Sequence, residues 1–149
     1  MSQDAYQVAE RFIGLRELPG DAHHPFIQWG LMLCKFGHDA ADEVPWCSAF
    51  VNAIAFICGL ERTQSARARS WLLAGKPVHI EDAEIGDVVI LKRGTGDQPG
   101  PEVIEAPGHV GFFGGIEGDK VVILGGNQSD SVNVSRYPLL RVLGVRRLA

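Results

Sequence analysis

The chain has 149 residues, of which 46% are hydrophobic and 21% are charged. This length and composition predict one compact domain over residues 1–149, with a hydrophobic core of its own, and exclude a multidomain enzyme. The 14 Lys and Arg residues against 18 Asp and Glu residues give a net charge of −4. Because no basic run appears, we expect no nucleic-acid partner.

The cysteine usage and the N-terminus indicate where the chain is made. Cys34, Cys47 and Cys58 show no CxxC spacing, so we expect a reduced thiol, with neither a disulfide framework nor a metal site. The N-terminus lacks a basic segment followed by an apolar one, and no apolar stretch reaches about 18 residues. We therefore expect synthesis in the cytoplasm without a signal peptide, and no membrane partner.

The first half of the chain is predicted to be helical. Apolar residues recur with helical spacing, and Pro or Gly stands at most of the boundaries. The first expected helix has an apolar face over 5–13. Three further helices are expected over about 25–36, 45–58 and 65–74. Arg67 and Arg69 in the last of these are expected to form a solvated face.

After Pro77 the period becomes strand-like. The expected strands are DVVILK, HVGFFGG, KVVILGG, SVNVS and RVLGVRR. Helices followed by strands predict an α+β fold, with N-terminal helices packed on a mostly antiparallel β-sheet. DVVILK is apolar on both faces, as in a central strand. The segment 93–108 has no periodicity over roughly 16 residues, a length typical of lids and binding loops.

Cys47 is the best candidate for a nucleophile. It falls in the first turn of the helix that starts near Pro45, where unpaired N–H groups and the helix dipole favour a thiolate. The competing interpretation is that all three cysteines are small buried hydrophobic residues, the commoner role of cysteine.

A nucleophilic cysteine needs a base, and His109 is the best candidate among five histidines. It opens the strand HVGFFGG directly after the long loop. The alternative is a solvated histidine at a strand start, with His38 as a weaker rival for the base. His24 and His79 are expected to face water, as is His23.

Strand geometry predicts Asn127 as the third member of the site. A three-residue loop between the strands of HVGFFGG and KVVILGGN would pair residues 116 and 120, and hence His109 with Asn127. A neutral amide there can fix the orientation of the imidazole. The alternative is that Asn127 only serves the turn GGNQSD, and a loop of another length would move it to an adjacent position.

Residues beside the nucleophile complete the candidate site. Asp42 and Glu43 are placed as ordinary capping and dipole partners of the helix, although Glu43 could also bind a substrate amine. Trp46 adjoins the cysteine, and we expect it to contact substrate as well. The sequence contains no phosphate loop, nucleotide fingerprint or HExxH motif, so no cofactor is expected.

Taken together, these segments resemble the CHAP and NlpC-type branch of the papain-like peptidoglycan hydrolases, particularly its small single-domain members from bacteria and phages. DEVPWCSAFVNA resembles the nucleophile helix, IGDVVILKRG the first central strand, GHVGFFGG the histidine strand and LGGNQSDSVNV the third-residue strand. The resemblance runs from about Pro25 to Arg147. It implies nucleophile, base and orienting roles for Cys47, His109 and Asn127.

The resemblance also implies a function. We expect a cysteine endopeptidase or amidase that cleaves an amide bond of the cell-wall peptide through a thioester, and we expect a monomer. Without an export signal the chain would reach the cell wall as a phage lysin or as a secreted effector, which could have an inhibitor or immunity protein as partner, or it would serve another purpose in the cytosol. The alternatives are a noncatalytic cell-wall peptide-binding domain and an acyltransferase that uses the same two residues.

Overall fold

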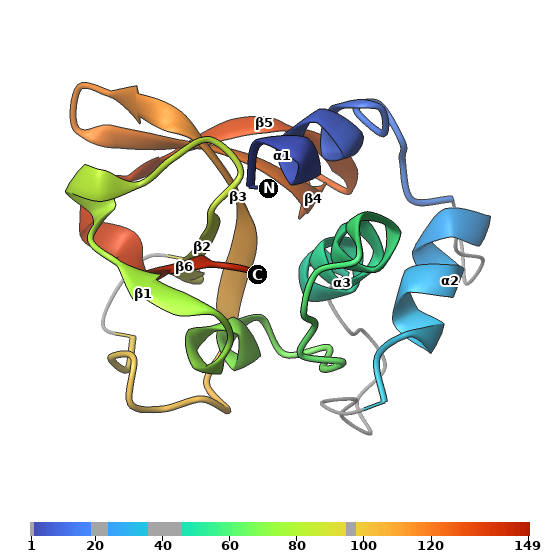
Figure 1. The fold of residues 1–149 in the computed structure, drawn as a ribbon, viewed down its shortest axis with the longest axis horizontal. Helices are drawn as coiled ribbons and strands as arrows, with labels where there is room; N and C mark the ends of the chain where they lie inside the picture. The colour runs from blue at the N-terminus through green and yellow to red at the C-terminus, as the bar shows by residue number, and fades with distance from the viewer. Residues whose placement is uncertain (1, 19–23, 36–45, 95–97) are drawn as a thin grey trace.

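The structure is a computed structural model, and it describes residues 2–18, 24–35, 46–94 and 98–149. Three α-helices precede the sheet: α1 (Ser2–Glu10), α2 (Pro25–Met32) and α3 (Cys47–Cys58). Helix α3 lies at the centre and contacts α1, α2 and two strands of the sheet (Figure 1). No helix among the described residues is long and apolar enough to cross a membrane.

Helix α3 is buried along most of its length. Its first nine residues, from Cys47 to Ala55, are all buried. The helix ends where the sequence predicts, because Gly59 adopts the left-handed conformation (φ 68°) and its N–H bonds back to the carbonyls of Ala55 and Phe56. An apolar helix that is covered all round lies inside a core, so α3 is fixed by contacts on every side.

The structure differs from three expectations about the helical half of the chain. Helix α1 ends at Glu10, so Ile13 at the end of its expected apolar face is exposed. His24 is not simply solvated, because its Nδ1 accepts a hydrogen bond from the N–H of Phe26 at 3.1 Å and caps α2. The fourth predicted helix is a short 3-10 helix, η1 (Ala68–Leu73), followed by Gly75 at φ 60°.

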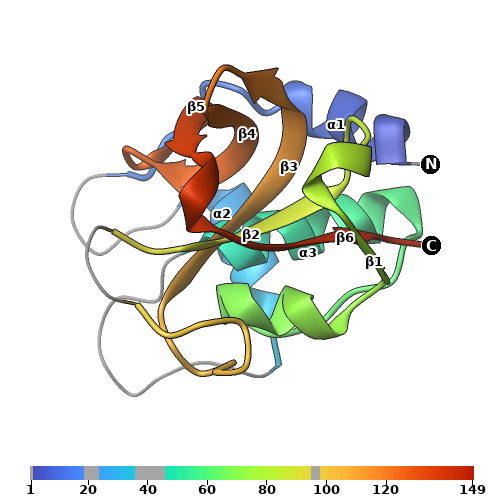
Figure 2. The ribbon, with the colours of Figure 1, turned by 90° about the vertical axis from the view of Figure 1, so that its left-hand side faces the viewer.

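The sheet is antiparallel throughout, with the order β1-β6-β2-β3-β4-β5. The five predicted strands are all present, and the short strand β1 is an addition. The strands are β1 (Lys76–Val78), β2 (Val88–Lys92), β3 (Gly108–Glu117), β4 (Lys120–Gln128), β5 (Ser131–Pro138) and β6 (Val142–Arg147). Figure 2 shows the sheet curling in front of α3.

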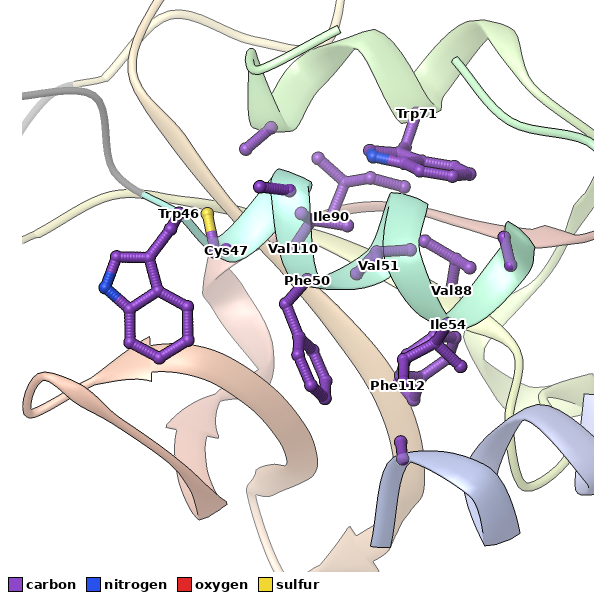
Figure 3. Packing of buried hydrophobic residues seen from close by; sticks show 14 of the residues in the cluster. Trp46, Cys47, Phe50, Val51, Ile54, Trp71, Val88, Ile90, Val110 and Phe112 are labelled. Atoms are coloured by element: carbon purple, nitrogen blue, oxygen red, sulfur yellow. The ribbon is translucent and has the colours of Figure 1, made fainter. Parts of the chain in front are cut away.

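Strand β2 is central and buried on both faces, as predicted. Val88 and Ile90 lie in the large core with α3, whereas Val89 and Leu91 lie in a second cluster on the other face of the sheet. Figure 3 shows Val88 and Ile90 beside Val51 and Ile54 of α3. The sheet is thus held by apolar packing on two sides.

Buried polar contacts fix α3 against the following segment. The Ser48 hydroxyl donates to the carbonyl of Ser65 at 2.6 Å and accepts from Nε1 of Trp71 at 2.9 Å. Asn52, one turn later, donates to the carbonyl of Ser65 and accepts from the N–H of Gln64. The buried polar groups of Ser48, Asn52 and Trp71 therefore have partners, as the low dielectric of a core requires.

Arg69 overturns the expectation of a solvated arginine pair on η1. Its side chain is 0% exposed, and its guanidinium donates to the carbonyls of Gly100, Val103 and Pro107 at 2.7, 3.2 and 3.0 Å. Arg67 also reaches this segment, through a hydrogen bond to the carbonyl of Glu105. Residues 100–107 of the long loop are therefore tied to Arg67 and Arg69, immediately before β3 and His109.

Candidate active site

The nucleophile candidate stands at the start of α3. Cys47 is the first residue of the helix and is 2% exposed. Figure 3 shows its sulfur at the end of α3, beside the indole of Trp46. The first N–H groups of a helix have no partner within the helix, and the helix dipole places positive potential there. A thiolate on Cys47 is therefore stabilised by the helix as well as by its neighbours.

The base candidate reaches the same point from the sheet. His109 is the second residue of β3, pairs with Leu91 of β2 and is 9% exposed. Its imidazole forms a hydrogen bond with the Cys47 thiol. The structure thus brings together the two residues that the sequence predicts as nucleophile and base, although 62 positions separate them (109 − 47 = 62).

The surroundings of the pair favour charge separation. Burial alone would raise the pKa of the Cys47 thiol, but the hydrogen bond and positive charge of His109, the N–H of Val110 and the charge of Arg93 outweigh it and lower that pKa. Burial likewise opposes protonation of His109, yet the hydrogen bond and negative charge of Cys47, helped by a hydrogen bond to Gln128, raise the pKa of the imidazole. The two shifts favour a thiolate and an imidazolium, the reactive form of such a pair.

Gln128, at the end of β4, is the residue that contacts the far side of the imidazole. Its Oε1 lies 2.9 Å from Nε2 of His109. Since Nε2 is engaged there, Nδ1 is the ring nitrogen left for the thiol. The amide is therefore positioned to hold the ring in the orientation that a Cys-His pair needs.

Asn127 is not the residue that bonds His109, so that prediction is corrected by one position. A bulge in the β4–β5 pairing between Gly125 and Gln128 interrupts the alternation of side chains, and the Asn127 backbone is left-handed (φ 57°). The side chain that reaches the imidazole is consequently that of the next residue. The adjacent amide in GGNQ was the only local signal that could have identified Gln128.

Tyr137, on β5, also contacts His109 and Gln128, and the sequence analysis did not predict it. Its ring lies 5.3 Å from that of His109, and its hydroxyl donates to Oε1 of Gln128 at 3.1 Å. The guanidinium of Arg141 lies over the same ring and donates to the carbonyl of Lys92. Burial raises the pKa of Tyr137 to about 12, so its hydroxyl stays protonated and acts as a donor.

The other predicted site residues are placed as follows. Trp46 is 2% exposed and belongs to the large core, so a substrate-binding role for its ring stays a prediction. Its Nε1 is buried and has no hydrogen-bond partner among the described residues. Asp42, Glu43 and the rival base His38 lie outside the described residues.

The described residues contain no cluster suited to a metal ion. Within these parts of the chain, no group of three or more His, Cys, Asp or Glu side chains could hold one. The chemistry that the site can support with its own residues is nucleophilic attack by sulfur together with proton transfer by imidazole.

Comparison with known proteins identifies the fold. No protein-family model and no curated protein match the chain. Among solved structures, NlpC1 from Trichomonas vaginalis aligns with 99% of the chain at a TM-score of 0.56 and 12% sequence identity. An NlpC/P60 family protein from Bacillus cereus ATCC 10987 also aligns with 99% of the chain, at a TM-score of 0.57 and 16% sequence identity. The chain spans only 44% and 40% of the length of those two proteins. The likeness therefore shows the fold alone. It is an NlpC-type α+β fold with helices packed on an antiparallel sheet, which confirms the predicted fold class.

Proposed function

We propose that the chain is a cysteine peptidase or amidase that hydrolyses an amide bond of the peptidoglycan peptide. The observation that carries this proposal is the hydrogen bond between Cys47 and His109, made at the first turn of a buried helix where the thiol pKa is lowered. A domain that only binds cell-wall peptide has no need of an activated thiol. The NlpC-type fold and the four sequence segments that resemble small CHAP and NlpC-type hydrolases support the choice of peptidoglycan.

The proposed reaction proceeds through a thioester. The Cys47 thiolate attacks the amide carbonyl carbon, and the carbonyl electrons move to an oxyanion that faces the first N–H groups of α3. The oxyanion collapses, the C–N bond breaks, and His109 gives its proton to the departing amine. Water then attacks the thioester while His109 takes its proton. The C–S bond breaks, the acid leaves, and the thiolate and imidazolium are restored.

Gln128 has the orienting role in this proposal, in place of Asn127. Its carbonyl oxygen accepts the Nε2 proton of His109, which fixes the tautomer and directs Nδ1 toward the sulfur. No cofactor takes part in the proposed reaction. The site of action would be the cell wall, reached by export through a secretion system or by release during phage lysis.

The test is hydrolysis of purified sacculi and soluble muropeptides, with the fragments identified by mass spectrometry. Cys47→Ala should abolish product formation, whereas Cys58→Ala is the matched control, because Cys58 lies at the far end of the same helix and burial raises its thiol pKa. A thiol-reactive amide analogue should label Cys47. If the unmodified protein leaves sacculi and muropeptides intact while it binds them, the noncatalytic interpretation is correct. If product appears only as an adduct with an added amine, the enzyme is an acyltransferase.

A further inference from the structure

The amide of Gln128 is held in one orientation by β5. Its Nε2 lies 2.7 Å from the backbone carbonyl of Asn133 and 3.0 Å from Oδ1 of the same residue. A backbone carbonyl can only accept a hydrogen bond, so the group facing it must be the NH2 end of the amide. The oxygen end of Gln128 therefore faces His109 and cannot exchange places with the nitrogen without losing these bonds.

The side chain of Asn133 is fixed in turn. Its Nδ2 donates to the backbone carbonyl of Gln128 at 2.6 Å and to the hydroxyl of Ser131 at 2.8 Å. Its Oδ1 accepts from Nε2 of Gln128 and from the hydroxyl of Ser135 at 2.5 Å. These bonds span the bulge that separates Gln128 from the regular part of β4, so Asn133 supports both the backbone and the side chain of Gln128.

Tyr137 holds the opposite end of the same amide. Its hydroxyl donates to Oε1 of Gln128 at 3.1 Å, and Nε2 of His109 lies 2.9 Å from the same oxygen. The hydroxyl oxygen of Tyr137 is itself 3.4 Å from Nε2 of His109. Because the Asn133 carbonyl fixes the other end of the amide as NH2, Oε1 is the atom between Tyr137 and His109, and it can accept a hydrogen bond from each of them.

We infer that Asn133 and Tyr137 are positioning residues that clamp the Gln128 amide from its two ends and thereby set the tautomer of His109. The clamp leaves Oε1 as an obligatory acceptor, so the imidazole must carry its proton on Nε2 and present Nδ1 to Cys47. The inference rests on the proposed function in one respect, since it assigns these residues to the Cys47–His109 pair. Neither residue needs to touch substrate.

The charged and titratable groups around His109 come from several elements. Cys47 faces it from α3, Arg93 acts on it from the segment after β2, and Tyr137 with Arg141 over its ring lies on the side of β5. Arg93 lowers the pKa of His109, opposite to the effect of Cys47 and Gln128. The side chains of Asn133 and Tyr137 are neutral, and so are their replacements in Asn133→Ala and Tyr137→Phe. Neither substitution therefore changes this set of charges.

The first measurement is the rate of Cys47 alkylation by iodoacetamide between pH 4 and 10, located by mass spectrometry. It needs no substrate, and the other two cysteines have raised pKa values and react at higher pH. In Asn133→Ala and in Tyr137→Phe, the rate at pH 6 should fall by about fivefold, the equivalent of one ordinary hydrogen bond. The matched control is Val134→Ala on the same strand, which should behave as the unmodified protein.

A second measurement separates positioning from general damage to the fold. In a Gln128→Ala background, Asn133→Ala and Tyr137→Phe should cause no further fall in rate, because the residue through which they act is gone. Nitrogen-15 spectra of the Cys47→Ala protein at pH 8 should show His109 as the Nε2–H tautomer, and Asn133→Ala should mix the two tautomers.

Two results would overturn the inference. One is alkylation profiles of Asn133→Ala and Tyr137→Phe that superimpose on that of the unmodified protein. The other is that Asn133→Ala and Tyr137→Phe lower the alkylation rate as much in the Gln128→Ala background as in the unmodified protein. That result would show that these residues act on the fold and not through the Gln128 amide. If the profiles shift as expected while sacculi remain intact, the clamp stands and only the proposed substrate is wrong.

Discussion

Replacing Gln128 by Ala tests the assignment of the third site residue. The change removes the acceptor that lies 2.9 Å from Nε2 of His109. Hydrogen bonds to charged groups contribute about 1.5–3 kcal/mol, so loss of this one should lower the rate of muropeptide hydrolysis by roughly 10- to 150-fold. The effect should fall mainly on kcat, because the amide orients the base and is not proposed to bind substrate.

The matched control for this prediction is Asn127→Gly. The Asn127 backbone has φ 57°, a conformation that glycine adopts without strain and alanine does not. Asn127→Gly should therefore keep nearly full activity. Initial rates would be measured together with thermal melting by circular dichroism, so that a loss of fold is not mistaken for a loss of catalysis. If Asn127→Gly is inactive and Gln128→Ala is active, Asn127 is the third site residue, as the sequence predicts.

Further predictions concern pH, the loop and the packing of α3. Because the thiol pKa of Cys47 is lowered and the imidazole pKa of His109 is raised, a plot of kcat/KM against pH should be bell-shaped. The value should fall on the acid side as the thiolate gains a proton and on the alkaline side as the imidazolium loses one. A value of kcat/KM that still rises above pH 9 would contradict this prediction. Arg69→Ala should lower the free energy of unfolding by about 3 kcal/mol in urea titrations, since three hydrogen bonds are lost. Arg67 is only half-buried, so Arg67→Ala should cost about 1 kcal/mol, and equal losses would refute the buried role of Arg69. Gly126→Ala should slow alkylation of Cys47 at pH 6, because a Cβ at Gly126 would lie 2.6 Å from the buried indole of Trp46, the residue before Cys47. An unchanged rate would show that the start of α3 tolerates displacement.

The sequence predicts Cys47 and His109 as nucleophile and base because each has a local signature. An apolar helix that opens on cysteine and a strand that opens on histidine can both be read within ten residues. The sequence also predicts the order of helices and strands, since the change of period at Pro77 is abrupt. The boundaries are less well predicted: α1 stops three residues before the end of its expected apolar face.

The sequence predicts the correct residue pairs at the centre of the β3–β4 ladder, although it predicts the wrong length for the turn that joins the two strands. The turn has two residues and not three, because Glu117 pairs with Lys120, yet a bulge between Phe113 and Gly115 restores the register. Phe112 therefore pairs with Leu124, as a three-residue loop would also give. The shorter turn and the bulge compensate for each other. A pattern of alternating apolar residues cannot reveal either of them, because it does not show where a strand contains an extra residue.

Residues that act through distant backbone atoms could not be predicted. Arg69 looked like a solvated helix residue because its partners are carbonyl groups of a loop more than 30 positions away, and backbone acceptors leave no mark in a sequence. Gln128 was missed by one position because the second bulge, at the end of β4, reverses the faces of the last residues of that strand. Both cases depend on irregular backbone, where periodic patterns carry no information.

The end of β4 couples the packing of helix α3 to the orientation of His109. A Cβ on Gly126 would lie 2.6 Å from the Trp46 ring and 2.8 Å from Cβ of Phe50, so the backbone of β4 is in direct contact with the start of α3. Two residues later the same strand presents Gln128 to His109. The glycine allows the helix start to sit close against the strand, and the bulge then turns the amide toward the imidazole. This short segment thus contacts the start of α3 through packing and His109 through a hydrogen bond, so it helps to hold Cys47 and His109, which come from distant parts of the chain, beside each other in a buried site.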